Sequence, residues 1–294
     1  MQDRYAGDIG DFGKFILLSE VEKQGLSIGI NWYKTEPMAA ERNNDGGYIE
    51  IPPSLRACDL QLAEKLSIIS KSKNRSVTAL EECKLIPDAV YYSEPVSSES
   101  RTEWHTQALT RFKKTDIDLV FLDPDNGLLV PSVKEHHPFS IKYCFYEEVV
   151  QYIEQGHSVL IYNHRSRKPE LKYFREIESK LYCCLQRDDI EILEITFPRY
   201  SVRDYFAVSR PEHSGKIRAA FSQMFSGKYV ETRLCQKPLT MGATYTEYRA
   251  RFSSKKNFQR HYQMLPEDIV LEMINNTDAS PAIKACMYSE WKSN

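Results

Sequence analysis

The chain has 294 residues, of which 41% are hydrophobic and 27% are charged, and 39 Lys and Arg residues oppose 41 Asp and Glu residues. These proportions are those of a globular protein and exclude both a disordered polar chain and a collagen-like repeat. Because the net charge is only −2, an argument for a nucleic-acid or membrane partner has to come from a local cluster. At roughly 150 residues per domain, the length predicts two domains, or one large α/β domain with an appendage.

The sequence carries neither a membrane signal nor a disulfide signal. No apolar run reaches the roughly 18 residues that a spanning helix needs, and residues 1–4 lack the charged-then-apolar pattern of a secretion signal. The seven cysteines are scattered, with no Cys-x-x-Cys pair and no His at ligand spacing, which favours free thiols over disulfides or a zinc site. We therefore expect a cytoplasmic protein without membrane contact.

Apolar spacing and punctuating Gly and Pro residues predict the elements in chain order. The first half is expected to hold helix 11–23, strand 26–33, a polar loop over 35–47, helices 59–70 and 76–83, strand 89–92, helix 103–113 and strand 118–122. Asp59 is the expected N-cap of helix 59–70. The second half is expected to hold turn 123–127, helix 146–155, strand 158–162, helix 169–181, strands 190–197 and 204–208, and helices 265–275 and 281–292.

The order of these elements indicates the fold class. Strand 118–122, helix 146–155 and strand 158–162 predict a parallel, right-handed βαβ unit, and strands 190–197 and 204–208 predict an antiparallel hairpin at the end of the sheet. We therefore expect an α/β, Rossmann-like domain over residues 1–225, with a mostly parallel sheet. A small, basic and mainly helical extension is expected over residues 226–294.

The extension carries a local positive charge. Eight Lys and Arg residues oppose two Glu residues over 228–262, and six aromatic residues lie among them. Between Lys228 and Arg260 the cations would make salt-sensitive phosphate contacts and the rings would stack on unpaired bases, so nucleic acid is one expected partner. A solvated surface, or a face that docks onto an acidic protein partner, explains the same pattern equally well.

An acidic turn follows the strand over 118–122. Its sequence is Asp123-Pro-Asp-Asn-Gly127, and polar groups directly after a buried parallel strand project into the ligand crevice of an open sheet. Asp123 and Asp125 would there accept hydrogen bonds from an amine, orient a nucleophile or hold a divalent cation. The alternative is an ordinary turn made of residues that favour turns.

A glycine-punctuated segment lies near the N-terminus. It reads Tyr5-Ala-Gly-Asp-Ile-Gly-Asp-Phe-Gly-Lys14, so that Gly7, Asp8, Asp11 and Lys14 stand at or near a helix start, where backbone can approach a ligand closely and an anion is favoured. The spacing is not that of a Walker loop. The alternative is a plain helix cap formed by Asp8 or Asp11.

A third group of polar residues ends the strand over 158–162. Because neighbouring strand ends share one crevice, Asn163 and His164 would face Asp123. The alternative for His164 is a structural, hydrogen-bonded histidine.

These motifs together resemble a known enzyme fold. The Gly-Lys helix, the strand over 26–33, the Asp-Pro turn and the terminal hairpin are similar to the core of class I, Rossmann-like S-adenosylmethionine methyltransferases. Tyr5-Ala-Gly-Asp8 with Asp11-Phe-Gly-Lys14 resembles the start of the large-subunit ribosomal-RNA adenine methyltransferase family. The same segments also resemble a group of bacterial and phage proteins with Gly-Asp-Ile-Gly-Asp-Phe-Gly-Lys and Phe-Leu-Asp-Pro-Asp-Asn-Gly motifs.

The resemblance implies S-adenosylmethionine as the cofactor, with Tyr5, Gly7, Asp8, Asp11 and Asp125 at its site. It also implies that Lys14 and Asp123 belong to the active site. In this first hypothesis Asp123 and Asn126 hydrogen-bond the acceptor amine of a nucleic acid, with His164 nearby. The glycine-rich loop that accommodates the methionine end of the cofactor is not found directly after strand 26–33, and the nearest glycines are at 46 and 47.

Two further hypotheses stay open. In the second, Asp8, Asp11, Asp123 and Asp125 collect around one or two divalent metal ions in a hydrolase or nuclease. In the third, supported by the missing glycine loop, the chain is a catalytically degenerate Rossmann-like module that binds a nucleotide or a protein partner. The first two hypotheses require the acidic turn and the N-terminal segment to line one pocket, and the third does not.

Overall fold

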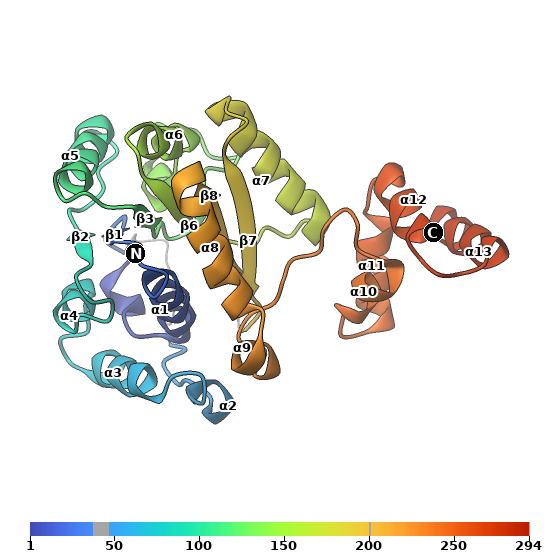
Figure 1. Cartoon of the computed structure of the whole chain (residues 1–294), viewed down its shortest axis with the longest axis horizontal. Coiled ribbons are helices and arrows are strands. Elements are labelled where there is room, and N and C mark those ends of the chain that lie inside the picture. Colours follow the sequence, from blue (N-terminus) through green and yellow to red (C-terminus); the bar gives the residue numbers. More distant parts are fainter. Residues whose placement is uncertain (38–46, 200, 294) are drawn as a thin grey trace. The chain divides into compact units, whose positions relative to one another are not determined.

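A computed structural model shows the fold of the chain (Figure 1) and describes residues 1–37, 47–199 and 201–293. The predicted loop over 35–47 falls mostly outside the described residues, as do Gly46 and, in the predicted hairpin turn, Tyr200. The chain forms two compact units: residues 1–165 with 181–237, and residues 166–180 with 238–294. Each unit is described by itself.

The first unit is built on a six-stranded sheet with the order β2-β1-β3-β6-β8-β7. Its strands are β1 (Ile28–Asn31), β2 (Val90–Tyr92), β3 (Leu119–Leu122), β6 (Ser158–His164), β7 (Glu191–Phe197) and β8 (Arg203–Ser209). From β2 to β6 all neighbours are parallel, whereas β8 is antiparallel to both β6 and β7. The predicted α/β class, mostly parallel sheet and terminal antiparallel hairpin are thus confirmed.

Helices and short elements surround this sheet. They are α1 (Ile9–Glu22), α2 (Pro53–Arg56), α3 (Leu60–Lys71), α4 (Val77–Glu82), α5 (Arg101–Lys114), α6 (Tyr146–Glu154), α8 (Pro211–Met224), α9 (Gly227–Glu231), the 3-10 turns Asp3–Tyr5 and Pro138–Lys142, and the strand pair β4 (Gly127–Leu128) and β5 (Tyr143–Cys144). Asp59 caps α3 as predicted, because its side chain accepts a hydrogen bond from the Leu62 amide at 2.9 Å. Neither α8 nor α9 was predicted.

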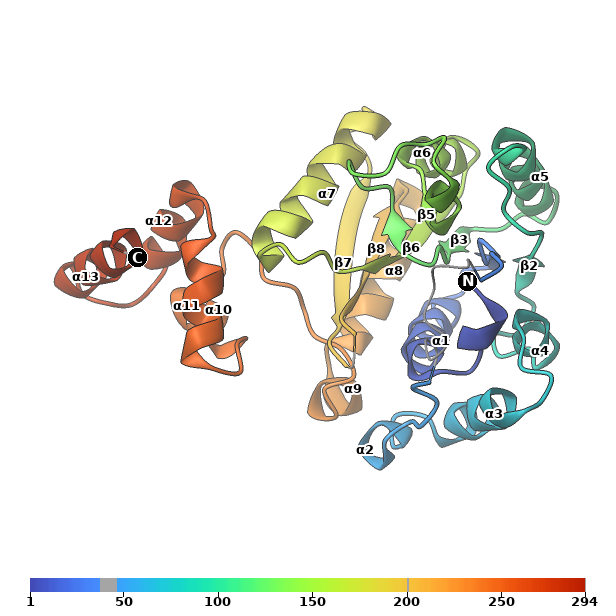
Figure 2. The same ribbon diagram turned by 180° about the vertical axis from the view of Figure 1, so that it is seen from behind.

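The core of the first unit lies between the sheet and its helices. Every residue of β1 and β3 is buried, as expected for parallel strands covered on both faces. α8 covers the face of the sheet that is turned to the viewer in Figure 1 and lies behind the strands in Figure 2. It packs beside α1, so that α1 is held against the sheet.

Two glycines let α1 approach the hairpin closely. A Cβ atom at Gly13 would lie 2.6 Å from the Phe197 ring of β7, and one at Gly10 would lie 3.0 Å from the Arg203 guanidinium of β8. These glycines therefore make room for the chain's own side chains. Their packing fixes the first turn of α1 near the ends of β6 and β8.

The second unit is helical. It contains the first part of α7 (Glu170–Leu185), then α10 (Tyr245–Ala250), α11 (Lys255–Gln263), α12 (Glu267–Asn275) and α13 (Pro281–Lys292). Three aromatic residues of this segment belong to its core: Tyr248, Phe258 and Tyr262 are at most 5% exposed. These three of the rings expected to stack on bases therefore fill the interior, and Tyr245 and Phe252 are partly buried against it. Nucleic-acid binding by the cations stays a prediction.

Other expectations concern boundaries, thiols and membranes. Residues 226–237, expected in the extension, pack with the first unit, where Tyr229 and Leu234 belong to the core. The seven cysteines are free, as predicted. Within the described part of the chain, no helix is long and apolar enough to cross a membrane.

Gly127 gives the first testable prediction. It closes the acidic turn with φ +103°, and a Cβ atom there would lie 2.0 Å from Asn163 Oδ1, which accepts a hydrogen bond from the Leu128 amide. Gly156 has nearly the same φ, +102°, with no atom near its Cβ position. We expect Gly156→Ala to lower the free energy of unfolding by about 1–2 kcal/mol through backbone strain alone.

Gly127→Ala should lower it by at least about 2 kcal/mol more, because it adds a clash and displaces a buried hydrogen bond. Denaturant unfolding of both variants measures the difference. Equal losses for the two would show that the contact with Asn163 does not constrain the turn.

Candidate functional site

A cavity of about 320 Å³ lies between the start of α1 and the carboxyl ends of β3 and β6 in the first unit. It is lined by Met1, Tyr5, Asp8, Gly10, Asp11, Lys14, Tyr48, Asp123, Pro124, Asp125, Asn126, Lys142, Tyr162, His164, Ser201 and Arg203. Both predicted motifs therefore meet in one cavity. Of the nine candidate site residues from the sequence, only Gly7 is not in the lining.

Lys14 stands at the centre of this arrangement. Its Nζ lies 2.7 Å from Asp11 Oδ1 and 2.7 Å from Asp123 Oδ2, and the side chain is 4% exposed. The Trp32, Phe121 and Tyr162 rings surround the ammonium at 5.4–5.9 Å. Although burial opposes the charged form, the two carboxylates outweigh it and raise the pKa of Lys14 above its usual value, so that Lys14 stays a cation.

Asp11 is held by the backbone as well as by Lys14. Its Oδ2 accepts a hydrogen bond from the Gly7 amide at 2.8 Å. Gly7 has φ +77°, and a Cβ atom there would lie 2.7 Å from the Leu66 carbonyl oxygen of α3. Gly7 thus shapes the turn that presents its amide to Asp11, and it contacts α3 instead of the cavity.

Asp8 is both the helix cap and a cavity residue. Its Oδ1 accepts a hydrogen bond from the Asp11 amide at 3.0 Å, and its Oδ2 lies 4.0 Å from the Arg203 guanidinium. Burial, followed by the negative charge of Asp11, raises the pKa of Asp8 from 3.8 to about 6. A carboxyl group kept in a cavity with such a shift is characteristic of functional sites.

Asp123 presents one constrained and one open oxygen. Oδ2 accepts the Lys14 hydrogen bond, while Oδ1 has no donor among the residues that the structure describes. Burial raises the pKa of Asp123 despite the opposing charge of Lys14. Asn126 follows at the cavity wall, held by backbone hydrogen bonds to Lys142 and His164, and within the described ranges its side-chain amide has no partner.

Asp125, in contrast, is tied up within the protein. Its Oδ2 accepts hydrogen bonds from Gln2 Nε2 at 2.8 Å and Thr35 Oγ1 at 3.1 Å, and the Met1 ammonium lies 2.8 Å from its Oδ1. The Lys142 ammonium is 3.6 Å away. These contacts fix the segment before α1 over the sheet, which is a positioning role.

Arg203 makes another part of the cavity wall basic. Of the residues there, the sequence analysis predicted His164 but not Arg203. The His164 Nε2 atom lies 2.8 Å from the Tyr162 hydroxyl, which accepts a hydrogen bond from Arg203 Nε at 3.3 Å. Although burial opposes it, the neighbouring groups Tyr162 and Asp8 raise the pKa of Arg203. Sequence reasoning missed Arg203, because its only signal is a lone cation at the start of an apolar strand.

The acidic residues do not fit a divalent metal. Asp11 and Asp123 are joined by the Lys14 cation, which stands where a shared metal ion would have to be, and Asp125 is joined to the Met1 ammonium. In the described ranges, no cluster of three or more His, Cys, Asp and Glu residues could hold a metal ion. Asp11, Asp123 and Asp125 are therefore paired with cations of the protein itself.

The residues after β1 do not fit the methionine end of S-adenosylmethionine either. Trp32 and Tyr33 are fully buried, with Tyr33 at φ +45°. Their carbonyl oxygens accept hydrogen bonds from the Met1 ammonium at 3.0 and 2.9 Å, and the Tyr33 hydroxyl donates to Glu148 Oε2 at 3.0 Å. The protein itself fills this place.

The pKa of Asp8 gives a second testable prediction. Because its pKa is raised on folding, the folded state holds the proton longer than the unfolded state, and the wild type should lose stability as the pH rises from 4 through 6. Asp8→Asn keeps a good helix cap without the charge. At pH 8 we expect this variant to be more stable than the wild type by up to about 3 kcal/mol.

The difference should vanish below pH 4, and thermal or urea unfolding across the pH range measures it. Asp59→Asn is the matched control, because Asp59 caps α3 through the same kind of hydrogen bond at a partly exposed position. If the Asp8→Asn variant is less stable than the wild type at pH 8, the charged form of Asp8 does not destabilise the folded state.

Comparison with known proteins adds no functional assignment. No protein-family model, no curated protein and no solved structure matches this chain.

Proposed function

We propose that the first unit is a methyltransferase-like protein that binds nucleic acid or a nucleotide by placing an amine-bearing base in this cavity. The contact between Lys14 and Asp123 carries the proposal, because it fixes one carboxylate oxygen and leaves the other open at the cavity wall. These two residues are also the ones to which the sequence resemblance assigns an active site.

The open groups favour an amine over a carbonyl. Asp123 Oδ1 is an acceptor, and the Asn126 amide can turn its oxygen to the same ligand group. An exocyclic amine of adenine or cytosine donates two hydrogens and satisfies both acceptors. The keto oxygen of hypoxanthine or uracil would instead face the lone pairs of a carboxylate, which leaves buried polar groups unpaired.

The rest of the cavity suits a ring and a phosphate. Tyr48 is 63% exposed at the cavity wall, and an exposed tyrosine ring is a surface on which a base stacks. His164 and Arg203 supply a polar and a cationic group to the cavity lining, and the Arg203 guanidinium can attract a phosphate. A volume of about 320 Å³ is at the small end of ligand sites and matches a single nucleotide.

Recognition is supported further than methyl transfer. The acceptor side of the expected enzyme, with Lys14, Asp123 and Asn126, lines the cavity, whereas the donor side after β1 is filled by Tyr33 and its neighbours. This combination corresponds to the third hypothesis, a Rossmann-like module that binds a nucleotide. The residues that would hold the base are those that the first hypothesis assigns to the acceptor amine. Methyl transfer is then an outcome that the test has to distinguish.

Calorimetry with pairs of nucleotides tests the proposal. We expect AMP and CMP to bind the protein at least 10-fold more tightly than IMP and UMP, because a hydrogen bond to a charged group contributes about 1.5–3 kcal/mol. Asp123→Asn should reverse this preference, since the asparagine oxygen remains with Lys14 and its amide nitrogen then presents hydrogens to the base. Asp118→Asn, at the opposite end of β3, is the control and should leave the preference unchanged.

Two results would contradict the proposal. One is the absence of nucleotide binding at millimolar concentration, and the other is equal affinity for amino and keto bases. The same calorimetry is repeated with S-adenosylmethionine and with its demethylated product. Tight binding of either would show that the region after β1 opens, and would favour a methyltransferase over a module that only binds nucleotides.

A further inference from the structure

In the second unit, α10 and α11 are consecutive helices joined by a short turn. Four residues, 251–254, separate the two helices, and Ser254 caps α11 by accepting a hydrogen bond from the Asn257 amide at 3.2 Å. A turn of this length is typical of helix-turn-helix motifs, in which the second helix enters the major groove of DNA. The motif lies wholly within the second unit and does not depend on the cavity.

Ring contacts fix which face of α11 points inward. The Tyr245 ring of α10 lies 5.2 Å from the Phe258 ring and 5.5 Å from the Tyr262 ring, one helical turn apart on α11. Trp291 of α13 donates its Nε1 hydrogen to the Tyr262 carbonyl oxygen at 2.9 Å. The apolar side of α11 is therefore covered on both flanks, and its orientation within the unit is set.

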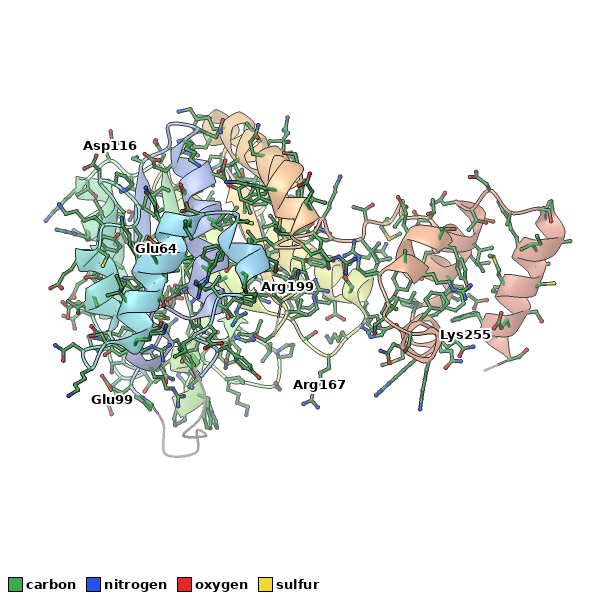
Figure 3. The ribbon with its side chains drawn as sticks, turned by 90° about the horizontal axis from the view of Figure 1, so that it is seen from below. Glu64, Glu99, Asp116, Arg167, Arg199 and Lys255 are labelled. Carbon is green, nitrogen blue, oxygen red and sulfur yellow. The ribbon has the colours of Figure 1, made fainter. Side chains whose placement is uncertain are left out.

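The opposite side of α11 is polar, exposed and basic. Its exposed residues are Lys255, Lys256, Asn257, Arg260 and Gln263, of which Lys255 is labelled in Figure 3. Lys256, Arg260 and Gln263 follow at spacings of four and three, which places them in one stripe. From residue 248 to residue 266 the chain has five Lys and Arg residues and no Asp or Glu.

The cations on the exposed side of α11 are available to a partner. In the part of the chain that the structure describes, Lys255, Lys256 and Arg260 have no carboxylate within ion-pair distance. Arg251, in contrast, lies 3.2 Å from Glu170 and belongs to the internal packing of the unit. The stripe thus differs from a solvated face in which opposite charges neutralise one another.

We propose that the exposed face of α11 binds double-stranded DNA in the major groove. Lys and Arg neutralise phosphates or contact guanine, and Asn and Gln are the residues that read adenine. Of the six rings that would stack on single-stranded bases, four are buried and the other two, Tyr245 and Phe252, are partly buried against the core of this unit, and the major groove of A-form RNA is too narrow for a helix. Duplex DNA is the partner that matches the remaining groups.

Fluorescence anisotropy with a labelled 30-base-pair duplex and the full chain tests this inference. The double variant Lys256→Glu, Arg260→Glu should bind at least 10-fold more weakly at moderate salt, and the slope of log affinity against log salt should fall by about two. The matched control is Lys113→Glu, Lys114→Glu on α5, which reverses two neighbouring charges of the first unit. It should change the affinity less than twofold.

Each other result overturns the inference. These are tighter binding to single-stranded DNA, to RNA duplex or to anionic phosphatidylserine vesicles than to duplex DNA, no duplex binding by the wild type, and equal losses in the variant and the control. Circular dichroism and thermal unfolding accompany the titrations. Because both substituted side chains are exposed, we expect unchanged unfolding, and Lys256→Gln, Arg260→Gln gives the same comparison without a reversed charge.

Discussion

The buried ammonium of Lys14 joins two segments that lie more than one hundred residues apart in the chain. It ties Asp11 on the first helix to Asp123 at the end of the central strand β3, and the cavity exists because these two elements are held together. Removing one member of such a buried set leaves an unpaired charge, which costs about 3–5 kcal/mol. Ion pairs of this kind contribute little net stability compared with apolar packing, so its value lies in the single geometry that it enforces.

The same geometry places carboxylates closer to one another than stability alone would favour. Asp8 and Asp11 share the first turn of α1, and the charge of one disfavours the charge of the other. Lys14, Arg203 and backbone amides compensate for this repulsion in part. The repulsion between these carboxylates lowers the stability of the fold, but it keeps a defined pattern of charge in the cavity, as is common in ligand sites.

The parts of the fold that depend on local pattern were predictable. Apolar runs identified β1, β3 and β6, and the rule that parallel strands end at one edge brought the acidic turn together with the end of β6. That the N-terminal segment meets them was an assumption from the motifs, which the cavity lining bears out. α8 was missed although its signal is local: the buried residues Ile217, Ala220, Phe221 and Met224 follow helical spacing, and Pro211 stands at its first turn.

Two site features were beyond sequence reasoning because they depend on tertiary packing. Arg203 reaches the cavity only because β8 inserts between β6 and β7, and nothing near it in the chain shows that partner. Gly10 and Gly13 suggested room for a ligand, whereas the space is taken by Arg203 and Phe197. The aromatic residues of the second unit likewise suggested a binding surface from their spacing among cations, but helical packing turns them inward.

The division of α7 between the two units determines how the helical unit could be removed from the chain or added to it. Residues 170–180 belong to the helical unit, where Leu171 joins its core, while residues 181–185 belong to the sheet-containing unit. A chain ended at Lys237 would keep Leu171 but lose the rest of the core to which it belongs. The helical unit is thus no removable tail, and loss or gain of it by recombination would require two breakpoints, one of them inside a helix.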